Sequence, residues 1–489
     1  MAMAEKMKNI LLITADQWSG KYLGCAGNSD IMTPSLDELA SYGIRYSNAI
    51  SATPVCISAR RELLLGVSAR THGDRTFDTK KPMPKTLPTL VQCLRNQGYQ
   101  AYCTGKLHVF PPRDRCGFDD VHLIEEGRHL GGMNQDDYER YLAKKGYAGL
   151  EFAHGMCNNN YFYRPFHLPE DCHPTTWITR DICEQIKRRD PTRPAIWYAS
   201  YISPHPPYIP LKDYLDLYRD VDFQSPQIGE WTKNDDLPYG YQYYAHLYHI
   251  DTQKKMFDAY RAYYALCTHI DHQIRLIIGT LREEGILEDT IILFTADHGE
   301  MLGNHNLWQK NLMYEQSVNI PMILVPTFDC GLEVGVTDDR IVELKDVLPT
   351  LMTLAGADVP DFVEGISMVG DIKRDYCYGE LWEDDRATRM ILTKDYKLIY
   401  YITGNYFQLF DRNEDPFEIH DLSHDPNYSN IKNELECLLI ENLYGNDLTA
   451  LKQGRLNGLP HKEYNCTASR YDGIKLFQGR DMLLQRGIR

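Results

Sequence analysis

Three apolar runs along the chain each end in polar side chains of the kind found at catalytic sites. The runs and the polar residues that follow them are 8–14 with Asp16 and Gln17, 195–203 with His205, and 290–295 with Asp297 and His298. A continuous apolar run of this length predicts a buried parallel strand. Because the carboxyl ends of parallel strands meet at one edge of a sheet, we expect these polar groups to lie close together.

Segments with helical periodicity lie between these strands. Apolar positions recur at helical spacing in 33–42, 86–96 and 251–284, and a glycine follows shortly after each range. Glycine just beyond the last periodic residue commonly ends a helix. The alternation of strands and helices predicts an α/β fold, in which a large, mostly parallel sheet is flanked by helices.

The pattern changes after about residue 356. Apolar stretches at 390–401 and 405–411, separated by polar turns, predict a smaller antiparallel sheet. We therefore expect a catalytic α/β domain over residues 1–375 and a small β-sheet subdomain over residues 376–489. The segment from about residue 454 lacks periodicity and would form an arm over the body or over a partner subunit, which leaves room for a homo-oligomer.

Two long stretches, 125–174 and 206–249, interrupt the alternation of strands and helices. Insertions of this length in a compact domain are commonly binding loops. Five tyrosines crowd the second insertion, at positions 239, 241, 243, 244 and 248. We favour packing of the insertion over substrate stacking as their role.

The composition is that of a soluble globular protein. Of 489 residues, 43% are hydrophobic and 25% charged, and no apolar run is long enough for a membrane helix. A formal net charge of −16 opposes nucleic-acid binding, which needs clustered lysine and arginine. The N-terminus lacks an apolar signal region, and the 13 cysteines are scattered without close pairs. We expect a cytoplasmic enzyme with mainly free thiols.

A cysteine and an arginine four residues apart, Cys56 and Arg60, open an apolar helical run that ends at Gly66. The free amides and the dipole of a helix N-terminus stabilise negative charge. A nucleophile there, with a guanidinium one turn away, is well placed to attack an anionic ester. Taken alone, the pair would be read as a buried structural cysteine with a surface arginine.

The polar pairs that end two of the strands favour a metal site. Asp16, Gln17, Asp297 and His298 offer two carboxylates, an amide oxygen and an imidazole, a set suited to Ca²⁺, Mn²⁺ or Mg²⁺. Each pair alone would equally be a strand-end turn or cap. Their expected position at the carboxyl edge of the sheet favours metal binding.

Four further residues would make a cationic pocket in this acidic protein. Lys106 and His108 belong to a Gly-Lys-x-His element, His205 to Ser-Pro-His-x-Pro, and Lys310 follows the Asp-His pair by twelve residues. A single histidine or lysine is usually structural or solvated. Several such motifs in one chain favour a pocket for an anionic substrate.

In their order along the chain, these motifs resemble those of the type I sulfatases of the alkaline phosphatase superfamily. The motifs are Asp-Gln, Cys-x-x-x-Arg with a following Leu-x-x-Gly, Gly-Lys-x-His, Ser-Pro-His-x-Pro and Asp-His-Gly-Glu-x-Leu-Gly-x-His-x(4)-Lys. The match runs from residue 9 to about 421, because 409–418 also resembles that family's C-terminal subdomain. The resemblance implies an alkaline phosphatase-like fold and hydrolysis of a sulfate monoester.

The same resemblance implies a modified nucleophile and a metal ion. Cys56 would be converted by a maturation enzyme to formylglycine, whose hydrated aldehyde carries two hydroxyls. The metal, usually Ca²⁺ with Mn²⁺ or Mg²⁺ as alternatives, would be bound by that residue together with Asp16, Gln17, Asp297 and His298. It would polarise the sulfate and lower the pKa of the attacking hydroxyl.

Roles for the remaining motif residues follow from the resemblance as well. Arg60 would align the modified residue, while Lys106 and Lys310 would bind sulfate oxygens. His205 would protonate the departing alcohol, and His108 would then take a proton from the second hydroxyl to release sulfate. The reverse order of the two histidines stays open.

Two positions depart from the family pattern and bear on the alternatives. Ser58 stands where Pro or Ala is usual, and Gln17 stands where many relatives have Asp, which could favour Mn²⁺. One alternative is a phosphonate monoester or phosphodiester hydrolase of the same superfamily, against which Lys106 and His108 argue. The other is an idle anion-binding homologue with an unmodified Cys56. The leaving group, a sugar, an aryl alcohol, a steroid or choline, is open.

Overall fold

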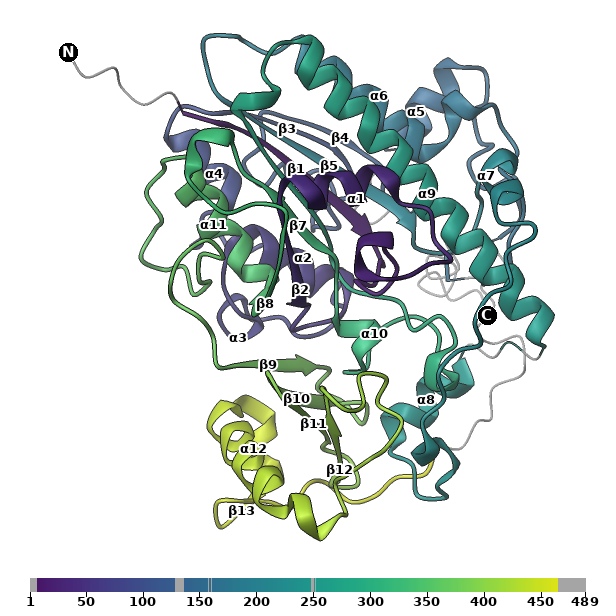
Figure 1. Ribbon diagram of the computed structural model, residues 1–489, viewed down its shortest axis with the longest axis vertical. Coiled ribbons are helices and arrows are strands. Elements are labelled where there is room, and N and C mark those ends of the chain that lie inside the picture. Colours follow the sequence, from purple (N-terminus) through teal and green to yellow (C-terminus); the bar gives the residue numbers. More distant parts are fainter. Residues whose placement is uncertain are drawn as a thin grey trace.

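The structure is a computed structural model that describes residues 7–127, 136–156, 158–159, 161–247, 250 and 252–464 of the chain. An eight-stranded sheet forms its centre, and a four-stranded sheet lies beside it, at the bottom of the view in Figure 1. The strands of the large sheet, in spatial order, are β4 (Asp120–Leu123), β3 (Gln100–Gly105), β5 (Ala195–Pro204), β1 (Asn9–Asp16), β6 (Thr290–Ala296), β7 (Met322–Val325), β2 (Ile44–Ile50) and β8 (Val336–Glu343).

The large sheet is mostly parallel, as predicted. Only β7 runs antiparallel to its neighbours β6 and β2. Every residue of β1 and β6 is buried, because helices cover both faces of the sheet. The three strands that the apolar runs predicted are β1, β5 and β6, and they are adjacent in the order β5-β1-β6.

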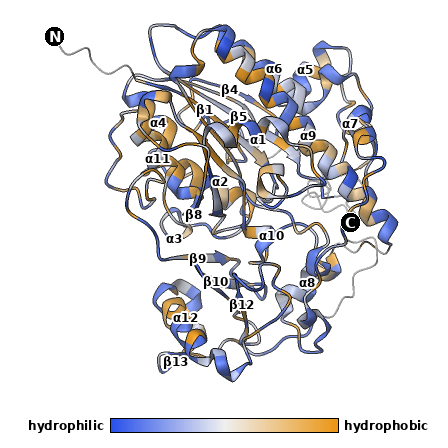
Figure 2. Cartoon of the chain, in the orientation of Figure 1, coloured by the Kyte–Doolittle hydropathy of each residue, from blue (hydrophilic) through white to orange (hydrophobic). Residues whose placement is uncertain are grey.

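Helices pack against the sheet in two groups, and the helices within each group contact one another. One group comprises α1 (Pro34–Tyr42), α6 (Pro174–Lys187), α7 (Lys212–Leu217) and α9 (Gln253–Glu283), and the other α2 (Cys56–Leu65), α3 (Ala69–His72), α4 (Leu90–Asn96) and α11 (Val347–Leu354). Hydrophobic residues gather in the sheet and on the helix sides that face it, while outer surfaces are hydrophilic (Figure 2). The α/β fold class is confirmed.

The helix expected over 86–96 begins later than the periodicity suggested. Thr89 caps α4 by accepting a hydrogen bond from the backbone of Gln92, whose side chain accepts one from the backbone of Thr89 in return. This reciprocal pair fixes the first turn at Leu90. Pro88 disfavours helical geometry in the residue before it, so the helix cannot extend further back.

The predicted small sheet is antiparallel, in the order β12-β11-β10-β9. Its strands and the elements around them are β9 (Tyr376–Leu381), β10 (Thr388–Thr393), β11 (Tyr396–Tyr401), β12 (Tyr406–Asp411), α12 (Ser429–Asn442), β13 (Leu451–Lys452) and β14 (Arg455–Leu456). The first strand, β9, was not foreseen. A turn divides 390–401 into two strands. The division at residue 375 stays a prediction, as does the terminal arm, most of which lies outside the described residues.

Buried ion pairs join the small sheet to the catalytic body. Lys397 on β11 is wholly buried and lies 2.9 Å from Glu315 and 2.6 Å from Glu418. Glu315 opens α10 (Glu315–Val318), which follows the loop that carries Lys310. The small sheet therefore packs against the segment that follows the Lys310 loop and supports that loop.

The two insertions contain α5 (Asp137–Lys144) and α8 (Tyr239–Leu247). Tyr241 and Tyr244 of α8 are buried, and the Tyr241 ring meets the Trp231 ring edge-on at 5.2 Å. Packing is thus what the structure shows for these two tyrosines. Tyr248 lies outside the described residues.

Within the described part of the chain, every helix is too short or too polar to span a bilayer. The cysteines in this part are free thiols.

Candidate active site

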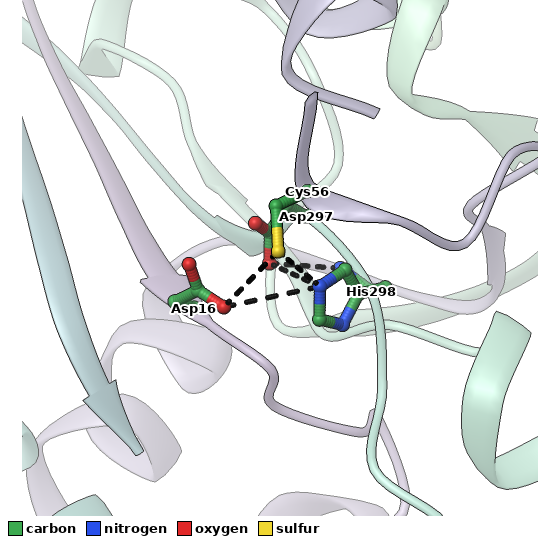
Figure 3. Close-up of side chains that lie close together, drawn as sticks. All are labelled: Asp16, Cys56, Asp297 and His298. Atoms are coloured by element: carbon green, nitrogen blue, oxygen red, sulfur yellow. Dashed lines mark hydrogen bonds and ion pairs between the residues drawn. The ribbon is translucent and has the colours of Figure 1, made fainter. Parts of the chain in front are cut away.

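The side chains at the ends of β1 and β6 converge on the first residue of α2, as Figure 3 shows. One ligand atom from each of Asp16, Cys56, Asp297 and His298 lies within 4.8 Å of the others, and all four residues are buried. The convergence follows from topology, because β1 and β6 are parallel neighbours whose carboxyl ends share one edge. The predicted geometry is therefore present.

His298 presents one ring nitrogen to this cluster. Its Nδ1 donates a hydrogen bond to the carbonyl of Gly299 at 3.1 Å, so its Nε2 keeps a free lone pair. That Nε2 lies 3.1 Å from the Cys56 sulfur. Burial lowers the pKa of His298 to about 4, which keeps the ring neutral and able to bind a metal. Burial and then the carboxylate of Asp16 raise the pKa of Cys56 to about 11.

Arg60 donates hydrogen bonds to the carboxylates of both Asp16 and Asp297. Its Nε donates to Oδ2 of Asp297 at 3.0 Å, and its Nη2 donates to Oδ2 of Asp16 at 3.2 Å. Its Nη1 donates to the carbonyl of Lys106 and to the hydroxyl of Ser200, both at 2.8 Å. The guanidinium is 2% exposed, so these interactions are shielded from water. Arg60 is thus no surface residue, and the simpler interpretation of the Cys-x-x-x-Arg motif is excluded.

Lys106 also holds Asp16. Its ammonium lies 2.6 Å from Oδ2 of Asp16 and 2.9 Å from Glu126. Burial opposes ionisation of Asp16, but Lys106, His205 and Arg60 outweigh it and hold the pKa of that carboxyl well below its usual value. Asp16 is therefore ionised and available to a cation.

Gly105 allows Lys106 to approach the neighbouring strand. Its φ is +125°, and a Cβ there would stand 1.9 Å from the carbonyl oxygen of Ser200. Only glycine fits such a position. The close approach lets the backbone N–H of Lys106 donate to that same carbonyl at 3.0 Å. The Gly-Lys pair of the motif thus has a packing reason.

The two predicted acid–base histidines follow neighbouring strands. His205, after β5, donates from Nδ1 to the carbonyl of Pro206 at 2.6 Å and lies 3.7 Å from Glu126. His108, after β3, packs its ring against Phe77 and lines a small cleft together with Ile57, the residue next to Cys56. Both histidines thus lie at the carboxyl edge, with His108 on the side of α2.

Gln17 and Lys310 meet although nearly three hundred residues separate them. The ammonium of Lys310 donates to Oε1 of Gln17 at 2.6 Å. On its other side, Nε2 of Gln17 donates to Glu300 and to the Tyr161 hydroxyl. Lys310 thus reaches the metal-ligand cluster through a predicted ligand.

Three residues of the site were not predicted: Glu126, Tyr161 and Glu300. Glu300 lies within the Asp-His-Gly-Glu motif, which was the available signal. Glu126 and Tyr161 come from the first insertion, where the sequence offered none. By contrast, His305 of the same motif lies away from the cluster, where its ring packs on Trp231 and Tyr314.

Comparison with known proteins identifies the family. The sulfatase family profile matches residues 8–357, and a profile for the C-terminal part of N-sulphoglucosamine sulphohydrolase matches residues 303–443. The chain belongs to the sulfatase family. Its activity is hydrolysis of sulfate esters, which confirms the function that the motifs predicted.

Curated relatives extend over nearly the whole chain. An arylsulfatase of Clostridium perfringens is 34% identical over 460 residues, which cover 90% of this chain and 95% of the relative. A choline-sulfatase of Rhizobium meliloti is 26% identical over 444 residues, which cover 86% of this chain and 83% of the relative.

Solved structures share the fold. A protein in complex with its substrate D-glucosamine-2-N,6-O-disulfate superposes with a TM-score of 0.72 at 21% identity, covering 89% of this chain and 97% of that one. A phosphonate monoester hydrolase of Agrobacterium radiobacter superposes with a TM-score of 0.75 at 20% identity, covering 87% and 94%. The alkaline phosphatase-like fold is thereby confirmed.

Proposed function

We propose that this sulfatase uses formylglycine derived from Cys56 as its nucleophile, with a divalent metal ion bound by Asp16, Gln17, Asp297 and His298. The observation that supports this is the convergence of ligand atoms from three segments within 4.8 Å, with the Cys56 side chain among them. The donor set, rich in oxygen with one imidazole, suits Ca²⁺ and also accommodates Mn²⁺ or Mg²⁺.

Residue 56 occupies a position suited to a nucleophile. It begins α2, where unsatisfied backbone amides and the helix dipole favour negative charge. Formylglycine would supply there, once hydrated, two hydroxyls on one carbon. A bound divalent ion would supply Lewis acidity toward a sulfate oxygen. Arg60 keeps both carboxylates oriented through the contacts described above.

The surrounding residues would share the charge and proton transfers. Lys106 and Lys310 would neutralise sulfate oxygens, and His205 would give a proton to the leaving alcohol as its S–O bond breaks. His108 would then take the proton of the second hydroxyl, so that its oxygen forms the aldehyde C=O, the bond between that carbon and the bridging ester oxygen breaks, and sulfate leaves with the bridging oxygen. Burial and Lys310 hold the pKa of His205 well below its usual value, and an anionic ester beside it would raise that pKa.

Mass spectrometry of the peptide around Cys56 tests the nucleophile. After co-expression with a formylglycine-generating maturation enzyme, the partner that this chemistry requires, we expect a lower peptide mass than that of the cysteine form. A Cys56→Ala variant from the same expression should bind a sulfate ester without cleaving it. A peptide that stays fully thiol in an active preparation would contradict the proposed nucleophile and, in an inactive one, would favour an idle anion-binding protein.

Paired substrates test the reaction against its main alternative. The fold is shared with phosphonate monoester hydrolases, and the Asp-Gln and Asp-His pairs suit both reactions. Lys106, which lies beside Asp16, favours sulfate-ester hydrolysis over phosphonate hydrolysis. We expect an aryl sulfate to be turned over faster than the matching phenylphosphonate ester, and the opposite preference would assign the chain to phosphonate hydrolysis.

A panel of sulfate esters tests the leaving group. Relatives include an arylsulfatase and a choline-sulfatase, so the panel pairs aryl and choline sulfates with sulfated sugars. We also propose a cytoplasmic location, which the free thiols of the described residues support, and a homo-oligomer formed through the C-terminal arm. Fractionation of the source cells and light scattering check these two proposals.

A further inference from the structure

Glu300 follows the proposed metal ligands Asp297 and His298, and the proposed reaction gives it no role. Its side chain is fully buried. Its Oε1 accepts hydrogen bonds from the backbone N–H groups of Leu302 and Gln309, both at 2.8 Å. One carboxylate oxygen therefore ties together the two ends of the loop that leads to Lys310.

The other carboxylate oxygen of Glu300 determines how Gln17 is turned. Oε2 accepts from Nε2 of Gln17 and, at 2.8 Å, from the hydroxyl of Tyr161. The same Nε2 lies 3.1 Å from the Tyr161 oxygen. With its nitrogen engaged on this side, Gln17 directs Oε1 the opposite way, where Lys310 donates to it at 2.6 Å.

An amide is nearly symmetric in shape, so its hydrogen-bond partners alone decide which end faces a given neighbour. A Gln17 side chain turned over would present an NH₂ group to both a metal ion and the Lys310 ammonium. Neither can accept a hydrogen bond, and a cation is repelled by the positive end of the amide dipole. The orientation of this single group therefore decides whether Gln17 can serve as a ligand.

We propose that Glu300 is a positioning residue that fixes the amide of Gln17 with its oxygen toward the metal site. The inference rests on the proposed function, because it concerns the ligand set named there. A carboxylate at position 17 would face the buried carboxylate of Glu300, and two like charges so close cannot both ionise. Positions 17 and 300 thus need one hydrogen-bond donor between them.

A donor exchange tests the inference through metal affinity rather than activity alone. Calorimetric titration of the metal-free protein with Ca²⁺ and with Mn²⁺ is the measurement. In Glu300→Gln, the amide nitrogens of residues 17 and 300 would face one another, so the Gln17 amide turns over. We therefore expect the affinity for the metal ion to fall about 10- to 100-fold, as for other residues that orient ligands. In Gln17→Glu/Glu300→Gln, the new amide donates to the new carboxylate, and we expect most of that loss to be recovered.

Two further variants separate positioning from a general structural effect. Tyr161→Phe removes one donor to Glu300 and leaves the carboxylate in place, so we expect a smaller loss, of about a few-fold. Glu288→Gln changes an exposed glutamate elsewhere and should leave affinity unchanged. Circular dichroism and thermal midpoints of the metal-free variants report on folding.

The outcomes are distinguishable from failure of the proposed function. Wild-type affinity in a folded Glu300→Gln or Tyr161→Phe variant would overturn the positioning role while leaving the metal site intact. So would a folded double variant that is as weak as Glu300→Gln. A wild-type protein that binds neither ion overturns the metal site itself, and with it this inference.

Discussion

Replacing Arg60 by lysine should weaken both the fold and the metal site. The guanidinium has four acceptors spread around its plane, namely carboxylate oxygens of Asp16 and Asp297, the Lys106 carbonyl and the Ser200 hydroxyl, at 2.8 to 3.2 Å. A lysine ammonium keeps the charge but is a point donor on a flexible stem, so it cannot span acceptors that diverge in this way. The substitution therefore tests geometry separately from charge.

The size of the effect follows from the bonds that are lost. A hydrogen bond to a charged partner contributes about 1.5–3 kcal/mol and one between neutral groups about 1 kcal/mol. If lysine keeps one carboxylate contact, the other carboxylate and the two neutral acceptors each lose their hydrogen bond from residue 60 in a buried site. We therefore expect a loss of about 3–5 kcal/mol in the free energy of unfolding, similar to that of breaking a buried ion pair.

Urea unfolding of the metal-free and metal-loaded proteins measures this loss. The deficit should be larger without metal, because a divalent ion would itself compensate the freed carboxylates. Arg61→Lys is the matched control, since Arg61 is the next residue of α2 but its partners lie outside the cluster: it donates to the backbone carbonyls of Lys81 and Pro82 and lies 3.7 Å from Asp74. An Arg60→Lys protein within about 1 kcal/mol of wild type, with unchanged metal affinity, would refute the reasoning.

Three further changes have defined outcomes. Asp297→Ala should remove most of the bound metal and most aryl sulfate turnover, as elemental analysis and a turnover assay would show, and normal values of both would refute the ligand assignment. Burial raises the pKa of Glu62 from 4.5 to about 8 despite the hydrogen bond from Thr53, so the folded state loses stability as the pH rises through that window. Glu62→Gln should therefore stabilise the protein by a few kcal/mol at pH 8 and little near pH 4.5, measured by urea unfolding at both pH values. Burial lowers the pKa of His173 from 6.5 to about 3, so the unfolded state binds more protons and stability falls as the pH drops below 6.5. His173→Asn keeps an N-cap acceptor for Thr175. It should reduce the stability difference between about pH 7.5 and pH 5.5 by roughly 1 kcal/mol, and an unchanged difference would contradict the lowered pKa.

The sequence was sufficient to predict an element where one local pattern determines the position of that element. Strands β1, β5 and β6 could be predicted because buried parallel strands read as continuous apolar runs. Once they are parallel neighbours, Asp16, His205 and Asp297 must share an edge, which needs no knowledge of side-chain contacts. The start of α4 could not be placed by periodicity, because a capping pair at Thr89 and Gln92 outweighed the apolar spacing.

Contacts between distant segments could not be predicted in the same way. Glu126 contacts Lys106, and Tyr161 contacts Gln17, from an insertion without regular periodicity. Which polar residue of such a segment turns inward depends on how the segment packs, and packing is not encoded in local spacing. Glu300 had a motif signal, but only the structure shows that its four acceptor positions are all used.

In both carboxylates of the cluster, the two oxygens have different partners, and the arrangement is the same in each. In both Asp16 and Asp297, Oδ2 accepts from Arg60. The Oδ1 atoms face the other side, where that of Asp297 accepts the backbone N–H groups of Gln17 and His298 and that of Asp16 lies 3.9 Å from the Cys56 sulfur. In each carboxylate, Oδ2 is thus held by Arg60, while Oδ1 lies toward Nε2 of His298, at 3.8 Å for Asp16 and 3.7 Å for Asp297. Because an amide in either place would set a donor against Arg60 or against the cation site, both positions require a carboxylate for geometry as well as for charge.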